Sequence, residues 1–201
     1  MNASEHKDHK PEPGILVVGI NLCIIGLVAG IILAVTNYFT EPIRKANEEK
    51  AKIEAQQKLL PEASLFEPIT DSEGCFVGKD QKGGLVGYII SIKQKGFEGF
   101  IEMMVGVDST FAVTDYKILK AKETPGLGAK AKEDFFRKQF KGRKVGNFEV
   151  SKVPDDKKIV ALTGATITSR AVANGIQNGI TQLEQKLEGG QGSEKKEGSN
   201  G

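Results

Sequence analysis

Hydrophobic residues dominate one long stretch near the N-terminus of the chain. Residues 14–40 contain no charged side chain. As an α-helix this stretch would be about 40 Å long, against a bilayer hydrocarbon core of about 30 Å. The pattern therefore predicts a single transmembrane helix over residues 14–40. A secretory signal peptide is the alternative, but the apolar run is longer than a typical signal-peptide core, so we favour an uncleaved anchor.

Charged residues dominate the next stretch of the chain. Residues 41–60 mix Lys, Arg and Glu with few apolar positions, Pro42 suits the first turn of a helix, and Pro61 would end it. We predict a solvated juxtamembrane helix over residues 41–60 rather than a coiled coil, because no apolar heptad persists. Residues 1–13 and 188–201 are polar tails and are predicted to be disordered.

Period-two and helical patterns alternate through residues 61–187. They predict strands at residues 85–92, 100–107, 112–120, 145–150 and 159–162, and a helix at residues 130–140. The strand at 100–107 would place on one face Ile101, Met103, Val105 and Val107. Residues 168–187 have the apolar spacing of an amphipathic helix, at Val172, Ile176, Ile180, Leu183 and Leu187. Antiparallel strands with interspersed helices predict an α+β domain.

Composition excludes several classes of function. The 28 basic and 26 acidic residues give a net charge of only +2, and the chain has no Trp. Nucleic-acid binding is therefore disfavoured. Both histidines, His6 and His9, lie in the N-terminal tail, and Cys23 and Cys75 form no metal-binding spacing. We expect neither a catalytic triad nor a metal site.

The anchor raises two further questions, one of orientation and one of packing. More positive charge follows the predicted span than precedes it, which by charge alone places the C-terminal part in the cytoplasm, although long domains translocate largely regardless of charge. Gly26 and Gly30 form a Gly-xxx-Gly pair that suits close approach of a second helix, and a plain anchor is equally compatible with them.

Hydroxyl side chains crowd the corner where a predicted strand meets the last predicted helix. The run at residues 162–169 is Leu-Thr-Gly-Ala-Thr-Ile-Thr-Ser. A helix N-terminus presents unpaired N–H groups and a positive dipole end, which together favour an anion such as a phosphate. The same residue types also form ordinary helix caps and turns, so this corner alone leaves both interpretations open.

A second segment, Glu-Thr-Pro-Gly-Leu-Gly at residues 123–128, precedes the predicted helix at 130–140. Proline stiffens such a loop, and glycine permits close backbone approach. The segment is compatible with a tight connection or with a backbone shelf for a flat ligand, with Glu123 and Thr124 as polar edges.

Taken together, the two segments and the single N-terminal span resemble the membrane-anchored FMN-binding domain family. The likeness is to the G subunit of the Rnf-type ion-translocating oxidoreductase, and the C subunit of the sodium-pumping NADH:quinone reductase is a relative. Residues 60–61, 96–99 and 104–108 add to the likeness, which covers roughly residues 14–187.

In that family a flavin transferase joins the FMN phosphate to the Thr that closes a (Ser/Thr)-Gly-Ala-Thr unit. The resemblance implies Thr166 as the residue of covalent attachment. It implies as further cofactor-binding residues Thr163, Gly164, Ala165, Thr168, Ser169, Glu123, Thr124, Gly126, Leu127 and Gly128. In one departure, Val160 stands where the family motif usually has Asp, which leaves the efficiency of attachment open.

The resemblance implies an electron-transfer subunit of a complex that couples ferredoxin and NAD to Na⁺ or H⁺ transport. Expected partners are other membrane subunits and a flavin transferase, and the expected location is the inner membrane with the C-terminal domain extracytoplasmic. Two alternatives stay open. One is a stand-alone anchored flavoprotein, and the other is a non-redox anchored binding or sensor module.

Overall fold

A computed structural model of the protein describes residues 14–69, 74–155 and 157–194, with side chains as far as residue 188. The chain forms two compact units, residues 1–49 and residues 50–201. The predicted disorder of residues 1–13 and 195–201 lies outside the described residues. Residues 188–194 were also predicted to be disordered, and this was wrong, because helix α3 (Thr166–Glu194) continues through them.

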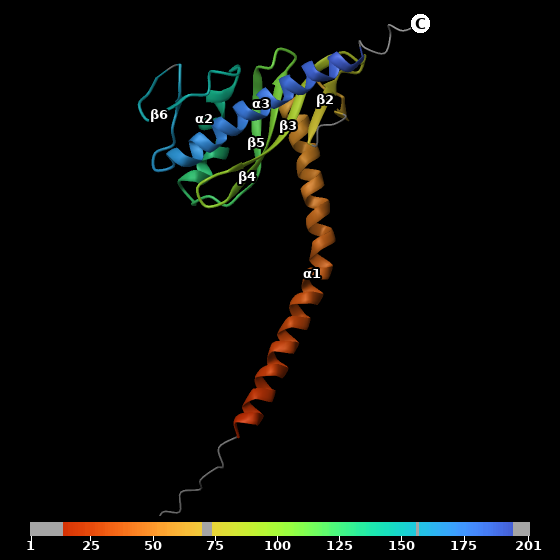
Figure 1. The fold of residues 1–201 in the computed structure, drawn as a ribbon, viewed down its shortest axis with the longest axis vertical. Coiled ribbons are helices and arrows are strands. Elements are labelled where there is room, and N and C mark those ends of the chain that lie inside the picture. Colours follow the sequence, from red (N-terminus) through yellow and green to blue (C-terminus); the bar gives the residue numbers. More distant parts are fainter. Residues whose placement is uncertain (1–13, 70–73, 156, 195–201) are drawn as a thin grey trace, which may run out of the picture. The chain divides into compact units, whose positions relative to one another are not determined.

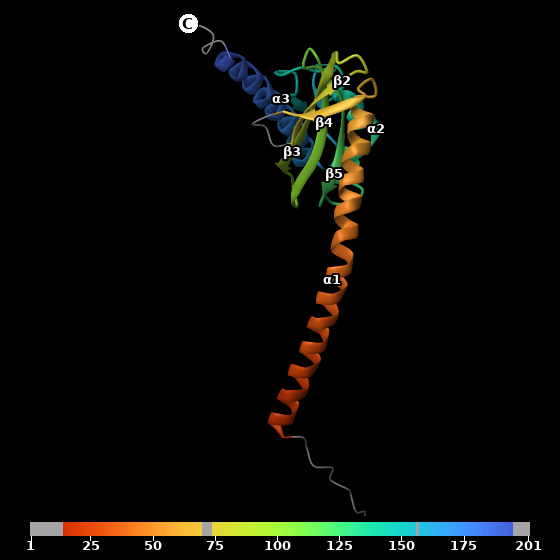
Figure 2. The same cartoon turned by 90° about the vertical axis from the view of Figure 1, so that its right-hand side faces the viewer.

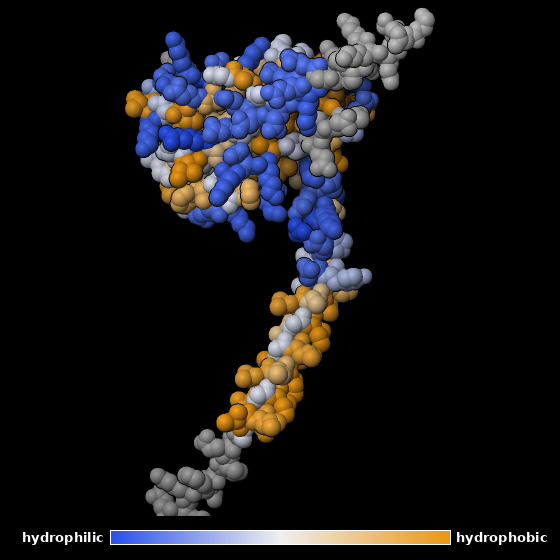
Figure 3. Space-filling model, viewed as in Figure 1, coloured by the Kyte–Doolittle hydropathy of each residue, from blue (hydrophilic) through white to orange (hydrophobic). Residues whose placement is uncertain are grey.

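The first unit contains most of helix α1 (Ile15–Leu59). Its apolar part is long enough to cross a membrane, and none of that part is buried. Figure 3 shows this apolar surface giving way to a polar one further along the helix. We predicted a juxtamembrane helix over residues 41–60 with Pro42 in its first turn, but Pro42 lies inside the single helix α1. A proline removes a single intrahelical hydrogen bond there, and Arg44 bridges Glu41 and Glu48 across the same turns.

An antiparallel five-stranded sheet organises the second unit (Figure 1). Its strands lie in sequence order, and the register of β3 and β4 pairs Tyr88 with Val107. They are β1 (Leu65–Pro68), β2 (Cys75–Lys79), β3 (Leu85–Lys95), β4 (Phe100–Asp108) and β5 (Val113–Ala121). The strands predicted at residues 100–107 and 112–120 pair as an antiparallel hairpin, β4 and β5, and the predicted α+β class is confirmed.

Two hydrophobic cores cover opposite faces of this sheet (Figure 2). The alternating side chains Ile101, Met103, Val105 and Val107 lie on one face of β4, as their spacing predicted, and share a core with helix α3. Met104 faces the other way and packs under residues 55–60 at the end of α1. Helix α3 starts two residues before its predicted first residue and continues past its predicted end at 187.

The predicted helix at residues 130–140 is wrong as a single element. It consists of a 3₁₀ helix η1 (Gly128–Lys132), one turn of α2 (Asp134–Arg137) and a 3₁₀ turn η2 (Lys138–Phe140). Glu133 interrupts the helix because its backbone is extended, with φ −81° and ψ 150°. This break allows Phe136 and Phe140 to be fully buried while Phe135 stays exposed.

The strands predicted at residues 145–150 and 159–162 are shorter in the structure. They are β6 (Val150–Ser151) and β7 (Ile159–Val160), which pair in parallel. Arg143 explains part of this difference. Its guanidinium donates to the carbonyls of Gln139, Asn147, Lys157 and Lys158. Because a side chain satisfies these carbonyls, the segment does not need a longer strand pairing.

Candidate functional site

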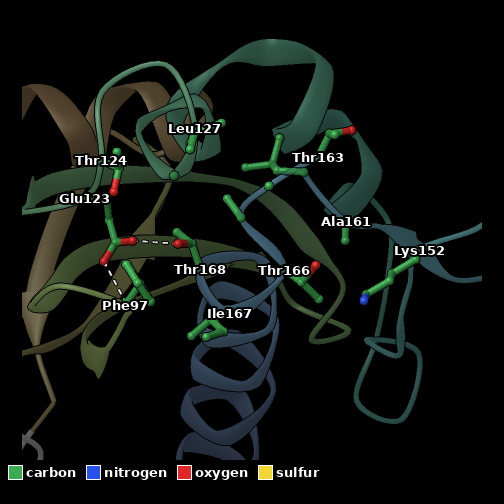
Figure 4. A pocket seen from close by; sticks show the side chains of 14 residues that line it. Phe97, Glu123, Thr124, Leu127, Lys152, Ala161, Thr163, Thr166, Ile167 and Thr168 are labelled. Carbon is green, nitrogen blue, oxygen red and sulfur yellow. Dashed lines mark hydrogen bonds between the residues drawn. The ribbon is translucent and has the colours of Figure 1, made fainter.

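Both predicted loops line one cleft, which has a volume of about 620 Å³ (Figure 4). Pockets that hold small molecules are typically about 300–1,000 Å³ in volume. Nine of the predicted site residues line the cleft, and they are Glu123, Thr124, Leu127, Gly128, Thr163, Gly164, Ala165, Thr166 and Thr168. The sequence therefore identified most of the wall of this cleft.

The strand-to-helix corner is built by Gly164 and Ser169. Gly164 has a φ of +76°, a backbone conformation that glycine adopts without strain. The buried Ser169 hydroxyl accepts the N–H of Leu162 at 2.9 Å and donates to the carbonyl of Ala165 at 3.0 Å. Ser169 therefore braces the corner from inside and does not line the cleft.

The corner presents free N–H groups to the cleft. Within the described part of the chain, the amides of Thr166, Ile167 and Thr168 have no hydrogen-bond acceptor, as expected in the first turn of a helix. These donors and the dipole of α3 make this end of the cleft favourable for an anion. Lys152, whose side chain is exposed, also lines the cleft and adds a positive charge beside Thr166 (Figure 4).

The three Thr hydroxyls at the corner differ in accessibility. Thr163 is exposed, Thr166 is half-buried, and Thr168 is only 1% exposed. The Thr168 hydroxyl donates to Oε2 of Glu123 at 2.5 Å. Thr166 thus combines contact with the cleft, partial shelter and a hydroxyl that makes no hydrogen bond to another described residue.

Glu123 links three segments that are distant in sequence. Its Oε2 accepts the Thr168 hydroxyl, and its Oε1 accepts the backbone N–H of Phe97 at 3.0 Å. A Cβ on Gly128 would lie 2.8 Å from Oε2, and one on Gly96 would lie 2.2 Å from Oε1. Both glycines therefore make room for this one carboxylate.

Part of the cleft wall is apolar and open. Phe97, Leu127 and Ile167 are 61%, 42% and 55% exposed. They come from the turn between β3 and β4, the 123–128 loop and the first turn of α3. Thr124 adds a polar edge, with its hydroxyl donating to Oε1 of Glu98 at 2.5 Å. The cleft thus joins an anion-binding end to an apolar shelf suited to a flat ring.

Two predicted site residues lie away from the cleft wall. Gly126 is exposed with a φ of +75° and shapes the loop, while Ser169 braces the corner. The cleft also contains five residues that we did not predict, namely Phe97, Lys152, Ala161, Leu162 and Ile167. Ala161, Leu162 and Ile167 adjoin the predicted motif in sequence, whereas Phe97 and Lys152 reach the cleft only through the fold.

Metal ligands do not gather in the described residues, since no group of three or more His, Cys, Asp or Glu side chains occurs there. The chemistry that the cleft offers is anion binding by amides and Lys152, next to an accessible Thr hydroxyl and an apolar shelf.

Comparison with known proteins places similarity over both loops. A family model described as an FMN-binding domain matches residues 96–181. Among curated proteins, the chain is 34% identical to the G subunit of the proton-translocating ferredoxin:NAD(+) oxidoreductase complex from Clostridium ljungdahlii, over 87% of this chain and 94% of that protein. It is 32% identical to the G subunit of the ion-translocating oxidoreductase complex from Methanosarcina acetivorans, over 80% and 90% of the two chains.

Solved structures also resemble this chain. The C subunit of the Na(+)-translocating NADH-quinone reductase from Parabacteroides distasonis is 27% identical, with a TM-score of 0.45 over 53% of this chain and 58% of that one. NqrC from Shewanella oneidensis is 19% identical, with a TM-score of 0.46 over 63% and 74% of the two chains.

Proposed function

Because this chain belongs to the family of the G subunits of ion-translocating oxidoreductase complexes, we propose that it relays electrons through an FMN joined by a phosphoester to Thr166. The chain is a membrane-anchored, FMN-binding redox subunit of such a complex. The covalent bond, the attachment residue and the orientation of the domain are parts of the proposal.

The residues of the cleft suit both the phosphate and the ring of FMN. The amides of Thr166, Ile167 and Thr168, with Lys152, would hold the phosphate. The apolar side chains of Phe97 and Leu127 would hold the ring. A cleft of about 620 Å³ has room for a ligand of this size.

Attachment at Thr166 is supported by the burial, hydrogen bonds and positions of the other hydroxyl groups at the corner. The Ser169 and Thr168 hydroxyls are buried and already donate to Ala165 and Glu123. Thr163 is exposed and precedes Gly164, so it lies outside the helix whose amides would share the charge of the phosphate. Thr166 opens α3 and stands beside those amides.

FMN supplies the electron-transfer chemistry when it is bound. The residues of this chain bind and orient it and shelter its phosphate end. Among the cleft-lining residues there is no His or Cys, and the carboxylate of Glu123 already accepts two hydrogen bonds. This composition supports a relay better than an enzyme that needs its own acid or base.

The expected partners follow from the same membership. Other membrane subunits of a ferredoxin:NAD oxidoreductase would exchange electrons with this domain, and a flavin transferase would be required for maturation. We place residues 41–201 on the extracytoplasmic side, against the orientation that charge alone favours. Na⁺ and H⁺ are both open as the transported ion, since relatives with each name are similar to this chain.

Production of the full-length chain with and without a flavin transferase tests this proposal. With the transferase and FAD, we expect a fluorescent flavin band that survives a denaturing gel, and no band without the transferase. Absence of the band in both samples would contradict the covalent relay. If the protein also binds no free FMN, the non-redox alternative is favoured.

A further inference from the structure

The cleft has one side chain of each charge, and they lie at opposite sides of the end of α3. Of the described residues that line it, Glu123 is the acid and Lys152 is the base. Figure 4 shows Glu123 beside Thr168 and Lys152 beyond Thr166. Residues two apart in an α-helix are separated by about 200° around its axis, so Thr166 and Thr168 point to nearly opposite sides. The charges therefore divide the same helix end into an acidic half and a basic half.

On the acidic half, the Glu123 carboxylate is held in a fixed position. Both oxygens of Glu123 accept a hydrogen bond, one from the Phe97 amide and one from the Thr168 hydroxyl. Gly96 and Gly128 leave space for the carboxylate, because a Cβ at either position would overlap one of its oxygens. The carboxylate is thus held in one place, at the boundary between the anion-binding end of the cleft and the apolar shelf.

We propose that Glu123 is a positioning residue that sets the polarity of the cleft. Its fixed negative charge repels a phosphate from the Thr168 side of the helix end and leaves the Thr166 side, where Lys152 lies. The same charge stands beside the shelf that would hold the ring, where it disfavours the gain of electrons and keeps the midpoint potential of the flavin low. This inference rests on the proposed function for its second consequence but not for its first.

The variant Glu123→Gln separates charge from shape. The amide oxygen of Gln still accepts the Phe97 N–H, and its NH₂ group donates to the Thr168 hydroxyl, which also serves as an acceptor. The matched control is Glu102→Gln, which makes the same change in net charge on β4, where Glu102 pairs with Lys93 at 3.3 Å and does not line the cleft.

The first readout needs no flavin. Inorganic phosphate is titrated into the full-length, transferase-free chain in detergent, and the backbone amide signals of residues 166–168 are followed by NMR. Loss of the charge in Glu123→Gln is expected to tighten phosphate binding on the order of threefold to tenfold. In the parent chain the amide signals of Thr166, Ile167 and Thr168 should all shift, because all three are free donors at this helix end. Glu102→Gln should bind phosphate as the parent does.

The second readout uses the flavin-loaded chain. We expect Glu123→Gln to raise the midpoint potential of the flavin, whereas Glu102→Gln leaves it unchanged. Glu123→Asp keeps the charge but shortens the side chain, so it should stay close to the parent in both readouts.

Unchanged phosphate affinity in Glu123→Gln would overturn the proposal, as would a change of equal size in Glu123→Asp, because the hydrogen bonds and not the charge would then be responsible. An unchanged potential in a loaded Glu123→Gln chain would likewise contradict it while leaving the covalent relay intact. A parent chain that takes up no flavin contradicts the proposed function alone, and the phosphate titration still decides the role of Glu123.

Discussion

Thr166 and Thr168 are two positions apart and have different environments. Thr168 is buried and its hydroxyl is bound to Glu123, while Thr166 is half-buried beside free amides. A phosphoester needs an accessible oxygen and donors that stabilise the remaining charge of the phosphate. At the residue scale, burial therefore distinguishes the attachment residue from a structural neighbour of the same type.

Replacing Thr166 by Val should abolish covalent flavin and leave the domain folded. The change removes one hydroxyl that makes no hydrogen bond to a described residue, so the cost in free energy of unfolding should be under about 1 kcal/mol. In-gel flavin fluorescence and circular dichroism measure the two effects. The matched variant Thr163→Val should keep most of the flavin. Fluorescence that persists in Thr166→Val would show that the bond lies elsewhere, with Thr168 the next candidate.

Replacing Gly128 by Ala should disturb the cleft through crowding. The new Cβ would lie 2.8 Å from both Oε2 of Glu123 and Oγ1 of Thr168, so the hydrogen bond between them would have to break or move. We expect a loss of thermal stability. Gly99→Ala is the control, since the atom nearest to its Cβ would be Cβ of Lys122 at 3.3 Å, which is less crowded than at Gly128. Equal melting temperatures for the two variants would contradict this reasoning.

At the scale of elements, local pattern predicted the parts of the fold with strong periodicity. The hairpin of β4 and β5 and the helix α3 both have apolar positions at regular spacing, and both form as expected. The helix at residues 130–140 was predicted wrongly because a backbone break at Glu133 has no signal in the apolar pattern. Strands β1 and β2 are short and lie at one side of the sheet, and we predicted neither.

The parts of the site that are formed by continuous segments of the chain could be predicted from the sequence. The 123–128 loop and the 163–168 corner supplied most of the cleft wall. Phe97 lies in the 96–99 stretch that added to the family likeness, but the likeness assigned it no role in binding. Lys152 escaped prediction because an exposed Lys has no distinctive local signal. Both residues reach the cleft through the pairing of β3 with β4 and through the segment that follows β6.

The 3₁₀ helix η1, which follows the 123–128 loop, is held by a buried hydrogen bond. The Tyr116 hydroxyl donates to the carbonyl of Ala131 in η1 at 2.5 Å, and burial raises the pKa of Tyr116, so the hydroxyl stays protonated. Tyr116→Phe leaves that buried carbonyl without its partner. We expect a loss of about 1–3 kcal/mol in the free energy of unfolding, measured by chemical denaturation.

The control for Tyr116→Phe is Tyr88→Phe. Tyr88 is half-buried and stacks on Phe111 at 5.5 Å, but its hydroxyl makes no hydrogen bond to another described residue. Its replacement should change stability by less than about 0.5 kcal/mol. Similar losses in both variants would show that the effect does not depend on the hydrogen bond to the Ala131 carbonyl.

At the scale of the whole molecule, the orientation of the chain decides where its electrons are delivered. We expect residues 41–201 to be extracytoplasmic. Lys82 is exposed in the turn between β2 and β3, so Lys82→Cys, made after replacement of Cys23 and Cys75, supplies a single accessible thiol. An impermeant thiol reagent should label it in intact cells. Labelling only after the membrane is permeabilised would reverse the assigned orientation.

Association with partner subunits should involve one face of the anchor. Gly26 and Gly30 are exposed with no atom of the chain within 4 Å of a Cβ there. Replacing both with Leu should therefore leave the chain intact but reduce co-purification of other subunits, because bulk prevents close helix contact. Val28→Phe with Val35→Phe adds bulk on the opposite face as a control. Equal recovery of partners in both would indicate a plain anchor.

The most direct test of the covalent relay is peptide mass spectrometry of the full-length chain matured with a flavin transferase. The peptide that contains the 163–169 corner should gain the mass of FMN less one water, and fragmentation should assign that mass to Thr166. The same added mass on Thr163 or Thr168, or a corner peptide with no added mass from a chain that carries flavin, would contradict attachment at Thr166.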